Sequence, residues 1–163
     1  MDVGIREMTP FDVAAKGFVH YTAWQETYRG LVPEPYLNDM TVEGCVQAAE
    51  IDPIPTLVAV ERGNVIGFVC YLEQAREFVQ REDASEIAAL YVLKKWQGQG
   101  IGSCLMNAAL SRLPHAKVAL FVLQGNTHAM EFYQRKGFYR TQRSISQEAG
   151  DGVIREWEML LER

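Results

Sequence analysis

Six consecutive residues, Gln-Gly-Gln-Gly-Ile-Gly at 97–102, have the composition of an anion-binding loop. Three glycines remove the side chains that would screen the main chain, so the backbone N–H groups can turn toward one point. A helical pattern begins near Ile101, and the N-terminus of a helix carries a partial positive charge. Together these features predict a cradle for a phosphate or diphosphate group.

Two common phosphate-binding motifs do not fit this loop. A P-loop requires G-x-x-x-x-G-K-[ST], but no lysine follows Gly100 or Gly102. The dinucleotide fingerprint requires G-x-G-x-x-G, and its third glycine would fall on Ser103 or Leu105, counted from Gly98 or Gly100. Taken alone, the loop is therefore either an anion site of another class or a tight structural turn.

A second block, residues 126–138, reads Asn-Thr-His-Ala-Met-Glu-Phe-Tyr-Gln-Arg-Lys-Gly-Phe, which follows the pattern N-x-x-A-x-x-F-Y-x-x-x-G-F. This block, with Q-x-x-G-x-G at 97–102, resembles the signature motifs of the GNAT superfamily of N-acetyltransferases. Residues 27–33, Thr-Tyr-Arg-Gly-Leu-Val-Pro, are similar to the loop that joins the first two helices in many bacterial members. The resemblance covers essentially the whole chain, so residues 1–163 are identified as a single acetyltransferase domain.

The resemblance implies acetyl-CoA as co-substrate, with no metal. Leu90, Tyr91 and Val92 would bind the pantetheine arm through their main chains, as an added strand does. Asn126 would contact the arm from the other side, and Tyr133 would place its hydroxyl near the thioester sulfur. The pyrophosphate would be held by the backbone amides of Gln97, Gly98, Gln99, Gly100, Ile101, Gly102 and Ser103.

Direct transfer of an acetyl group requires a neutral amine. Holding a lysine-like ammonium neutral at pH 7 costs roughly 4–5 kcal/mol, because its pKa is about 10.4. A general base and desolvation must supply this, and a strand N–H near Val92 could stabilise the oxyanion that then forms. Tyr133 is the candidate general acid for the departing thiolate, although it shares a helical face with Ala129 and Phe132 and could instead be a core aromatic.

Glu86 is the first candidate for the general base. It lies on a predicted strand at 86–92, and strict alternation places it on the same side as Ala88 and Leu90. The alternative is an exposed carboxylate at the end of the strand. Glu26, on the first predicted helix, is a weaker candidate for the base.

The acceptor pocket is expected to be lined by Trp24, Glu26 and Tyr28. Aromatic walls and a carboxylate suit a cationic amine, but the same residues could simply pack the first helix. The acceptor is a small-molecule or peptide amine, and polyamines, aminoglycosides, free amino acids, peptide N-termini and xenobiotic amines all remain open. The alternative function is a non-catalytic acyl-CoA-binding or regulatory module with the same fold.

Cys104 suggests a competing mechanism through an acetyl-cysteine intermediate. A thiol in the first turn of a helix can have a lowered pKa. Its apolar neighbours and its i, i+4 relation to Ala108 nevertheless predict that Cys104 faces the sheet. The histidines at 20, 115 and 128 have no metal-ligand spacing and no adjacent nucleophile, which predicts surface or helix-packing roles.

The elements that must position these residues alternate along the chain. Helices are predicted at 9–29, 41–50, 101–113 and 127–136, with strands at 3–8, 56–61, 64–73, 86–92, 117–123, 138–147 and 153–161. The order β-α-α-β-β-β-α-β-α-β-β predicts an α/β (α+β) fold with a mixed sheet and helices on both faces. The resemblance implies a mostly antiparallel sheet of about seven strands.

Three finer expectations concern single segments. The first helix is expected to bury Val13, Phe18, Tyr21 and Trp24. Gly30 and two prolines predict a loop before the second helix. The acidic stretch 73–86 is expected to be a mobile connection that ends at a strand edge.

Composition limits the classes of partner. The net charge of −5 argues against nucleic acid, which normally requires a basic face. No apolar run is long enough to predict a membrane segment. Three cysteines without a C-x-x-C pair are typical of a reducing compartment, which predicts a cytoplasmic protein. A homodimer is compatible with the family, where dimers are common.

Overall fold

A computed structural model describes residues 2–163, and within them seven strands form one sheet in the order β1-β2-β3-β4-β5-β7-β6. The strands are β1 (Val3–Glu7), β2 (Thr56–Glu61), β3 (Asn64–Leu72), β4 (Ala84–Val92), β5 (Lys117–Leu123), β6 (Tyr139–Ala149) and β7 (Gly152–Glu162). The helices are α1 (Val13–Thr27), α2 (Glu34–Asp39), α3 (Val42–Ile51), α4 (Ile101–Leu110) and α5 (Thr127–Arg135). The predicted class, a mixed and mostly antiparallel sheet with helices on both faces, is confirmed.

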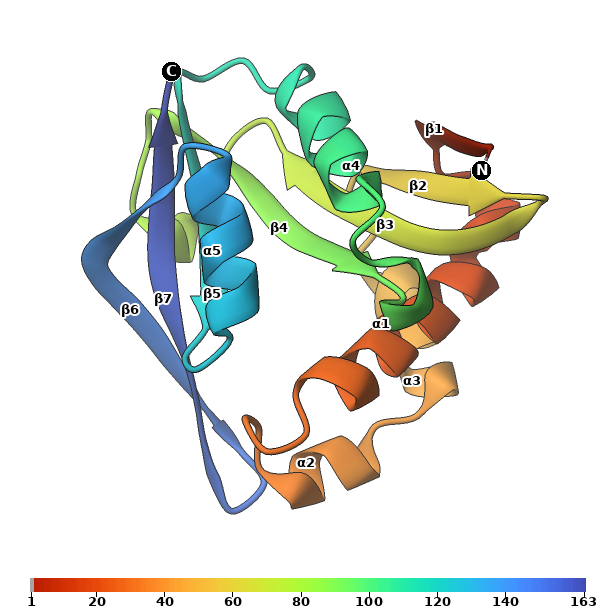
Figure 1. Cartoon of the computed structure of the whole chain (residues 1–163). Coiled ribbons are helices and arrows are strands. Elements are labelled where there is room, and N and C mark those ends of the chain that lie inside the picture. The colour runs from red at the N-terminus through yellow and green to blue at the C-terminus, as the bar shows by residue number, and fades with distance from the viewer. Residues whose placement is uncertain (1) are drawn as a thin grey trace.

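Helices cover both faces of the sheet (Figure 1). The largest core cluster lies under α4 and α5, where Leu105 and Met106 of α4 are fully buried. On the opposite face α1 packs on β3 and β4 and against α3, with Val19 completely buried. Among residues 2–163, no helix combines the length and apolar character needed to span a bilayer.

In the sheet formed within residues 2–163, β4 and β5 are the only parallel neighbours, and they pair over a short distance. Their register joins Ala84 to Lys117, Ser85 to Val118 and Glu86 to Ala119, and pairing ends there. On their outer sides, β4 continues beside β3 as far as Val92, and β5 pairs with β7 along its whole length. The two strands therefore diverge beyond Glu86, and Figure 1 shows them separating toward their carboxyl ends.

Several local predictions are confirmed. The strands predicted at 56–61 and 117–123 have those bounds in the structure. The second long helix begins after Thr41, whose hydroxyl accepts a hydrogen bond from the N–H of Gly44 at 2.9 Å. Gly137 follows α5 with a φ of 98°, which is the expected helix-ending conformation.

The helix predicted at 9–29 is shorter and buries a different face. A 3-10 turn at Pro10–Asp12 precedes α1, which ends at Thr27. Phe18 was expected in the core but is 51% exposed. The buried stripe instead runs through Lys16, Val19 and Ala23, because Gly17 lets α1 approach α3 closely and so sets the rotation of the helix.

One segment expected to be a loop contains a helix, and a second is packed against the fold. The predicted loop after Gly30 contains α2, because Pro35 occupies its first turn, where a missing N–H costs nothing. The stretch 73–86 is packed rather than loose, and Val79 is only 2% exposed. Its charges pair within the fold, as shown by Arg81, which binds the buried carboxylate of Glu158 at 2.7 Å.

The contact between α1 and α3 gives a stability prediction. A Cβ built on Gly17 would lie 2.4 Å from Cγ2 of Val46 and 2.9 Å from its backbone nitrogen. We expect Gly17→Ala to lower the free energy of unfolding by about 1–3 kcal/mol in urea denaturation, because α3 must shift. Gly4→Ala is the control, since a Cβ there has no neighbour within 4 Å. Equal stabilities for the two variants would contradict the close contact.

Candidate active site

The divergence of β4 and β5 opens a cleft through the sheet. Its central cavity, of about 330 Å³, is lined by residues 87–92 of β4 and 120–123 of β5. Toward α4 and α5 it continues into a groove beside the glycine loop. Toward α1 it continues into a second cavity, whose walls include Trp24, Ile87 and Tyr91 of the central one. The cleft is thus open to both faces of the sheet.

The glycine loop has the geometry of an anion cradle. Gly98 and Gly100 have φ values of 77° and 84°, and a Cβ on either would meet no atom within 4 Å. Within the described chain, no backbone N–H of residues 98–103 donates a hydrogen bond to the protein. Gln97 fixes the start of the loop, because its Nε2 donates to the carbonyl of Val92 at 2.9 Å. A run of unused donors at the start of α4 fits a diphosphate group.

The predicted pantetheine strand contains a β-bulge. The partners of Cys70 and Tyr71 on β4 are Ala89 and Ile87, so Ala88 is the extra residue. Leu90 consequently packs on the α4 side of the sheet, whereas Ala88 packs on the α1 side. The expectation that Glu86, Ala88 and Leu90 share one side is therefore wrong, because a bulge interrupts the alternation on which it rested.

Aromatic side chains form the wall of the cleft on the α1 side. The Nε1–H of Trp24 donates a hydrogen bond to the hydroxyl of Tyr91 at 2.9 Å. The rings of Tyr28 and Trp24 pack edge-on, with their centroids 4.7 Å apart. His20 stacks on Tyr91 with ring centroids 5.8 Å apart. Two predicted acceptor residues, Trp24 and Tyr28, thus lie at the cleft. Tyr91 belongs to this wall and also lines the central cavity.

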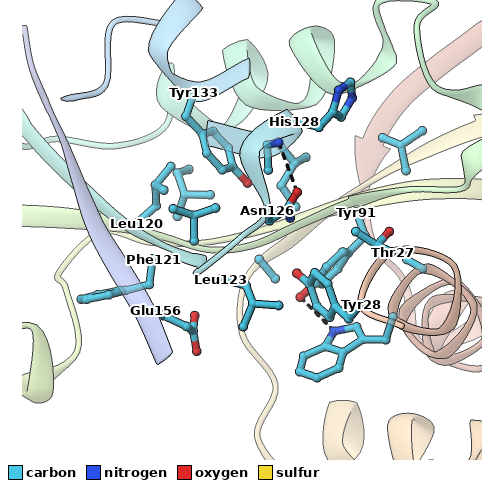
Figure 2. Close-up of a pocket in the computed structure, with 18 of the residues that line it drawn as sticks. Thr27, Tyr28, Tyr91, Leu120, Phe121, Leu123, Asn126, His128, Tyr133 and Glu156 are labelled. Carbon is cyan, nitrogen blue, oxygen red and sulfur yellow. Dashed lines mark hydrogen bonds between the residues drawn. The ribbon is translucent and has the colours of Figure 1, made fainter. Parts of the chain in front are cut away.

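Tyr133 and Asn126 approach the cleft from α5. Figure 2 shows the hydroxyl of Tyr133 pointing into the space between the strands. Burial, and to a smaller extent the neighbouring Tyr28, raise the pKa of Tyr133 well above its ordinary value, which keeps the hydroxyl protonated. Asn126 lines the same cavity, and its Oδ1 accepts from the N–H of Ala129 at 3.3 Å, so it also caps α5.

Glu86 is buried, with its side chain only 1% exposed. Both carboxylate oxygens accept hydrogen bonds from Arg76: Nη2 lies 2.5 Å from Oε2, and both Nε and the backbone N–H lie 3.1 Å from Oε1. Glu86 lines the cavity on the α1 side. The alternative of an exposed carboxylate is therefore wrong, because Arg76, ten residues earlier, folds back over it. The role of Glu86 as general base stays a prediction.

A second carboxylate at the cleft, that of Glu156 on β7, was not predicted from the sequence. It lines both the central cavity and the cavity on the α1 side (Figure 2). Burial raises the pKa of Glu156 above its ordinary value. The charge of Arg76 opposes this shift, and the charge of Glu86 adds to it. The sequence feature that could have indicated Glu156 is its spacing from Glu158, because strand alternation places the two glutamates on the same side of the terminal strand. That spacing does not reveal which glutamate is neutralised by an arginine.

Two predicted residues lie away from the cleft. The carboxylate of Glu26 is exposed and accepts from the backbone N–H of Lys94 at 3.2 Å, and Glu26 is not among the lining residues. Cys104 was expected to face the sheet but is exposed. The buried stripe of α4 runs through Ile101, Leu105 and Ala109, so Cys104 points outward and does not line the cleft.

Comparison with known proteins identifies the family. Residues 14–138 match the model of the Acetyltransferase (GNAT) family, so the chain belongs to that family. It is 28% identical over 159 residues to a protein of Mycobacterium tuberculosis named a probable N-acetyltransferase, a match that covers 93% of this chain and 88% of that protein. It is 32% identical over 119 residues to an uncharacterized N-acetyltransferase of Archaeoglobus fulgidus, covering 71% and 81%.

The fold is also shared with solved structures. The crystal structure of the PaiA N-acetyltransferase of Thermoplasma acidophilum, in complex with coenzyme A, superposes with a TM-score of 0.73 at 19% identity, covering 100% of both chains. The structure of PH1933 from Pyrococcus horikoshii gives a TM-score of 0.74 at 21% identity, covering 99% of each. At these identities the likeness establishes the fold.

The partly buried histidine beside Tyr91, His20, makes stability depend on pH. Burial, and then Lys16, lower the pKa of His20 from 6.5 to about 4. The unfolded chain therefore binds a proton that the folded protein excludes, and stability falls as pH drops from about 6.5 toward 4, by at most about 1.4 kcal/mol per pH unit. We expect His20→Phe to remove this slope in urea unfolding at several pH values. His115→Gln is the control, and a slope unchanged in His20→Phe would reject the assignment.

Proposed function

We propose that this protein transfers the acetyl group of acetyl-CoA to an amine of a small molecule or peptide, by direct attack within the cleft between β4 and β5. The observation that carries the proposal is the run of unused backbone amides at 98–103, which borders the same cleft as the hydroxyl of Tyr133. The first feature suits a diphosphate and the second suits a leaving thiolate. Their spacing along one groove suits a long ligand that carries both.

The edge of β4 supports binding of the pantetheine arm. Beyond Glu86 the side of β4 that faces β5 has no neighbouring strand, so the main chain of Leu90, Tyr91 and Val92 borders the cavity. An extended amide-containing chain can hydrogen-bond to such an edge as an added strand. The structural relative from Thermoplasma acidophilum holds coenzyme A, which agrees with this choice of donor.

The reaction requires few groups from the protein. Acetyl-CoA supplies an activated acyl group. The amine nitrogen attacks the carbonyl carbon, the C–N bond forms, and a backbone N–H near Val92 stabilises the oxyanion. As the C–S bond breaks, Tyr133 donates its proton to the thiolate sulfur. The new amide nitrogen loses its excess proton to solvent, which also restores the hydroxyl of Tyr133.

The aromatic wall on the α1 side suits the acceptor. Trp24, Tyr28 and Tyr91 present ring surfaces to the cavity that also contains Glu156. A cationic amine with an apolar body gains from both features, through cation–π attraction and charge pairing. Glu26 remains a proposed acceptor contact only for an acceptor that extends out of the cleft toward Lys94.

A turnover assay distinguishes the proposed enzyme from the alternative, a non-catalytic acyl-CoA-binding module. Release of the CoA thiol from acetyl-CoA is followed in the presence of spermidine, L-lysine, benzylamine and a short peptide with a free α-amino group. We expect acceptor-dependent release with at least one of them. Binding of acetyl-CoA without release for every acceptor would favour the non-catalytic module.

The general-acid role of Tyr133 predicts a loss of rate. We expect Tyr133→Phe to lower kcat by about ten- to a thousand-fold, because the thiolate must then leave without a positioned proton. The affinity for acetyl-CoA should change little. The control is Tyr139→Phe, which removes a surface hydroxyl bonded to Glu162. An unchanged kcat in a folded Tyr133→Phe protein would reject the role.

If the glycine loop holds the diphosphate, replacing one of its glycines should selectively weaken binding of acetyl-CoA. We expect Gly100→Ala to raise the Kd for acetyl-CoA about tenfold, measured by calorimetry, because a side chain disfavours the positive φ that aims the amides. Gly63→Ala is a matched control, since Gly63 has a φ of 79° and equally open surroundings in the β2–β3 hairpin. Equal loss of affinity in both variants would show that the effect is not local to the loop.

A further inference from the structure

Glu156 occupies the junction of the two connected cavities. It lies on β7 opposite Leu123, the last residue of β5, and so stands where the sheet opens. Its carboxylate is half-buried, yet within residues 2–163 it makes no side-chain hydrogen bond and no ion pair. A partly desolvated carboxylate that lacks a partner retains the capacity to bind a cation or a proton.

Two other buried carboxylates, those of Glu86 and Glu158, already have hydrogen-bond partners on both oxygens. Glu86 accepts hydrogen bonds from Arg76 on both oxygens, and Glu158 is held in the same way by Arg81 and by the hydroxyl of Thr141. A bidentate arginine stabilises the ionised form of a carboxylate and occupies the lone pairs that would receive a proton. Only Glu156 therefore combines a place on the cleft with unoccupied oxygens among these three.

We propose that Glu156 receives the ammonium group of the acceptor and takes its proton, so that the neutral amine attacks the thioester from the side of the sheet covered by α1. This inference rests on the proposed function, since it names the proton acceptor of that reaction. The hydroxyl of Tyr133 and the carboxylate of Glu156 enter the cavity from different elements, α5 and β7 (Figure 2). The arrangement separates the group that removes a proton from the group that supplies one.

The proton transfers balance across one cycle. An N–H of the ammonium group donates its proton to Oε of Glu156, and the lone pair that is freed forms the C–N bond. As the C–S bond breaks, Tyr133 protonates the sulfur. The second proton of the former ammonium group passes through solvent to the phenolate of Tyr133 and restores its hydroxyl, and Glu156 gives its own proton to solvent when the product leaves. The net change is one amide, one thiol and one proton released.

The titratable neighbours of Glu156 determine its pH dependence. Those that share its two cavities are Arg76, Glu86, Tyr28, Tyr91, His128 and Tyr133. Burial and the charge of Glu86 raise the pKa of Glu156, while Arg76 opposes them. The base is active when ionised, so kcat/KM should fall as pH drops through this raised pKa, above the ordinary range of a glutamate.

The test compares three variants with the best acceptor of the panel. We expect Glu156→Gln to lower kcat/KM at pH 7 by about 100-fold or more and to abolish the acidic limb of the pH profile. Glu86→Gln should keep that limb, whatever its effect on rate. Glu148→Gln, which removes an exposed carboxylate from β6, is the matched control for loss of charge. Loss of the limb in Glu86→Gln, with its retention in Glu156→Gln, would overturn the proposal.

Alkaline rescue distinguishes a base from a structural residue. At about pH 10 a large fraction of an alkylamine is already neutral, since its pKa is about 10.4. We therefore expect the deficit of Glu156→Gln to shrink at least tenfold between pH 7 and about pH 10. A deficit that is independent of pH would overturn the role in proton removal. Glu156→Asp, which keeps the carboxylate, should retain the acidic limb and provides the test if Glu156→Gln does not fold.

Two readouts do not depend on turnover. The Kd for acetyl-CoA, measured by calorimetry, should be unchanged in Glu156→Gln, because the proposal places this residue on the acceptor. Carbon NMR of labelled glutamate side chains should show one carboxyl with a raised pKa, absent from Glu156→Gln. If the wild type releases no thiol with any acceptor, the proposed function fails and this inference with it. If the wild type is active and Glu156→Gln matches it, this inference alone fails.

Discussion

The candidate site depends on one constraint, the short pairing between β4 and β5. Each strand is held along its outer edge, β4 by β3 and β5 by β7, while the inner edges share three residue pairs and then part. The bulge at Ala88 adds to the divergence, since a bulge bends a strand and increases its twist. The result is a sheet with a continuous core on its faces and an opening near its middle. The candidate functional groups lie around that opening.

The carboxylates near the opening differ in whether an arginine is paired with them. Arg76 and Arg81 come from the segment that links β3 to β4, and each folds back onto a buried glutamate, Glu86 or Glu158. Such pairs are costly to disrupt, because removal of one partner leaves a buried charge uncompensated. Glu156 has no such arginine partner within residues 2–163. Aromatic rings fill the remaining wall on the α1 side.

The predictions from sequence succeeded where the signal is local. The bounds of two strands, the cap at Thr41 and the glycine at 137 depend on neighbours within a few residues, and all three are confirmed. The errors arose where the outcome depends on a distant partner. Phe18 points outward because α1 is oriented by its contact with α3, and Cys104 because the sheet selects a different stripe of α4. The alternation of β4 failed at a bulge that no composition signal marks.

The amino-acid sequence by itself determined the donor half of the site. Three glycines before a helix predict an anion cradle through local sterics, and the block from 126 to 138 carries the family resemblance that implies acetyl-CoA as the donor. The acceptor half was decided only by the tertiary structure. Whether Glu86 or Glu156 keeps free oxygens depends on which arginine reaches which carboxylate across the fold. That choice follows from strand order and register, which no short stretch of sequence contains.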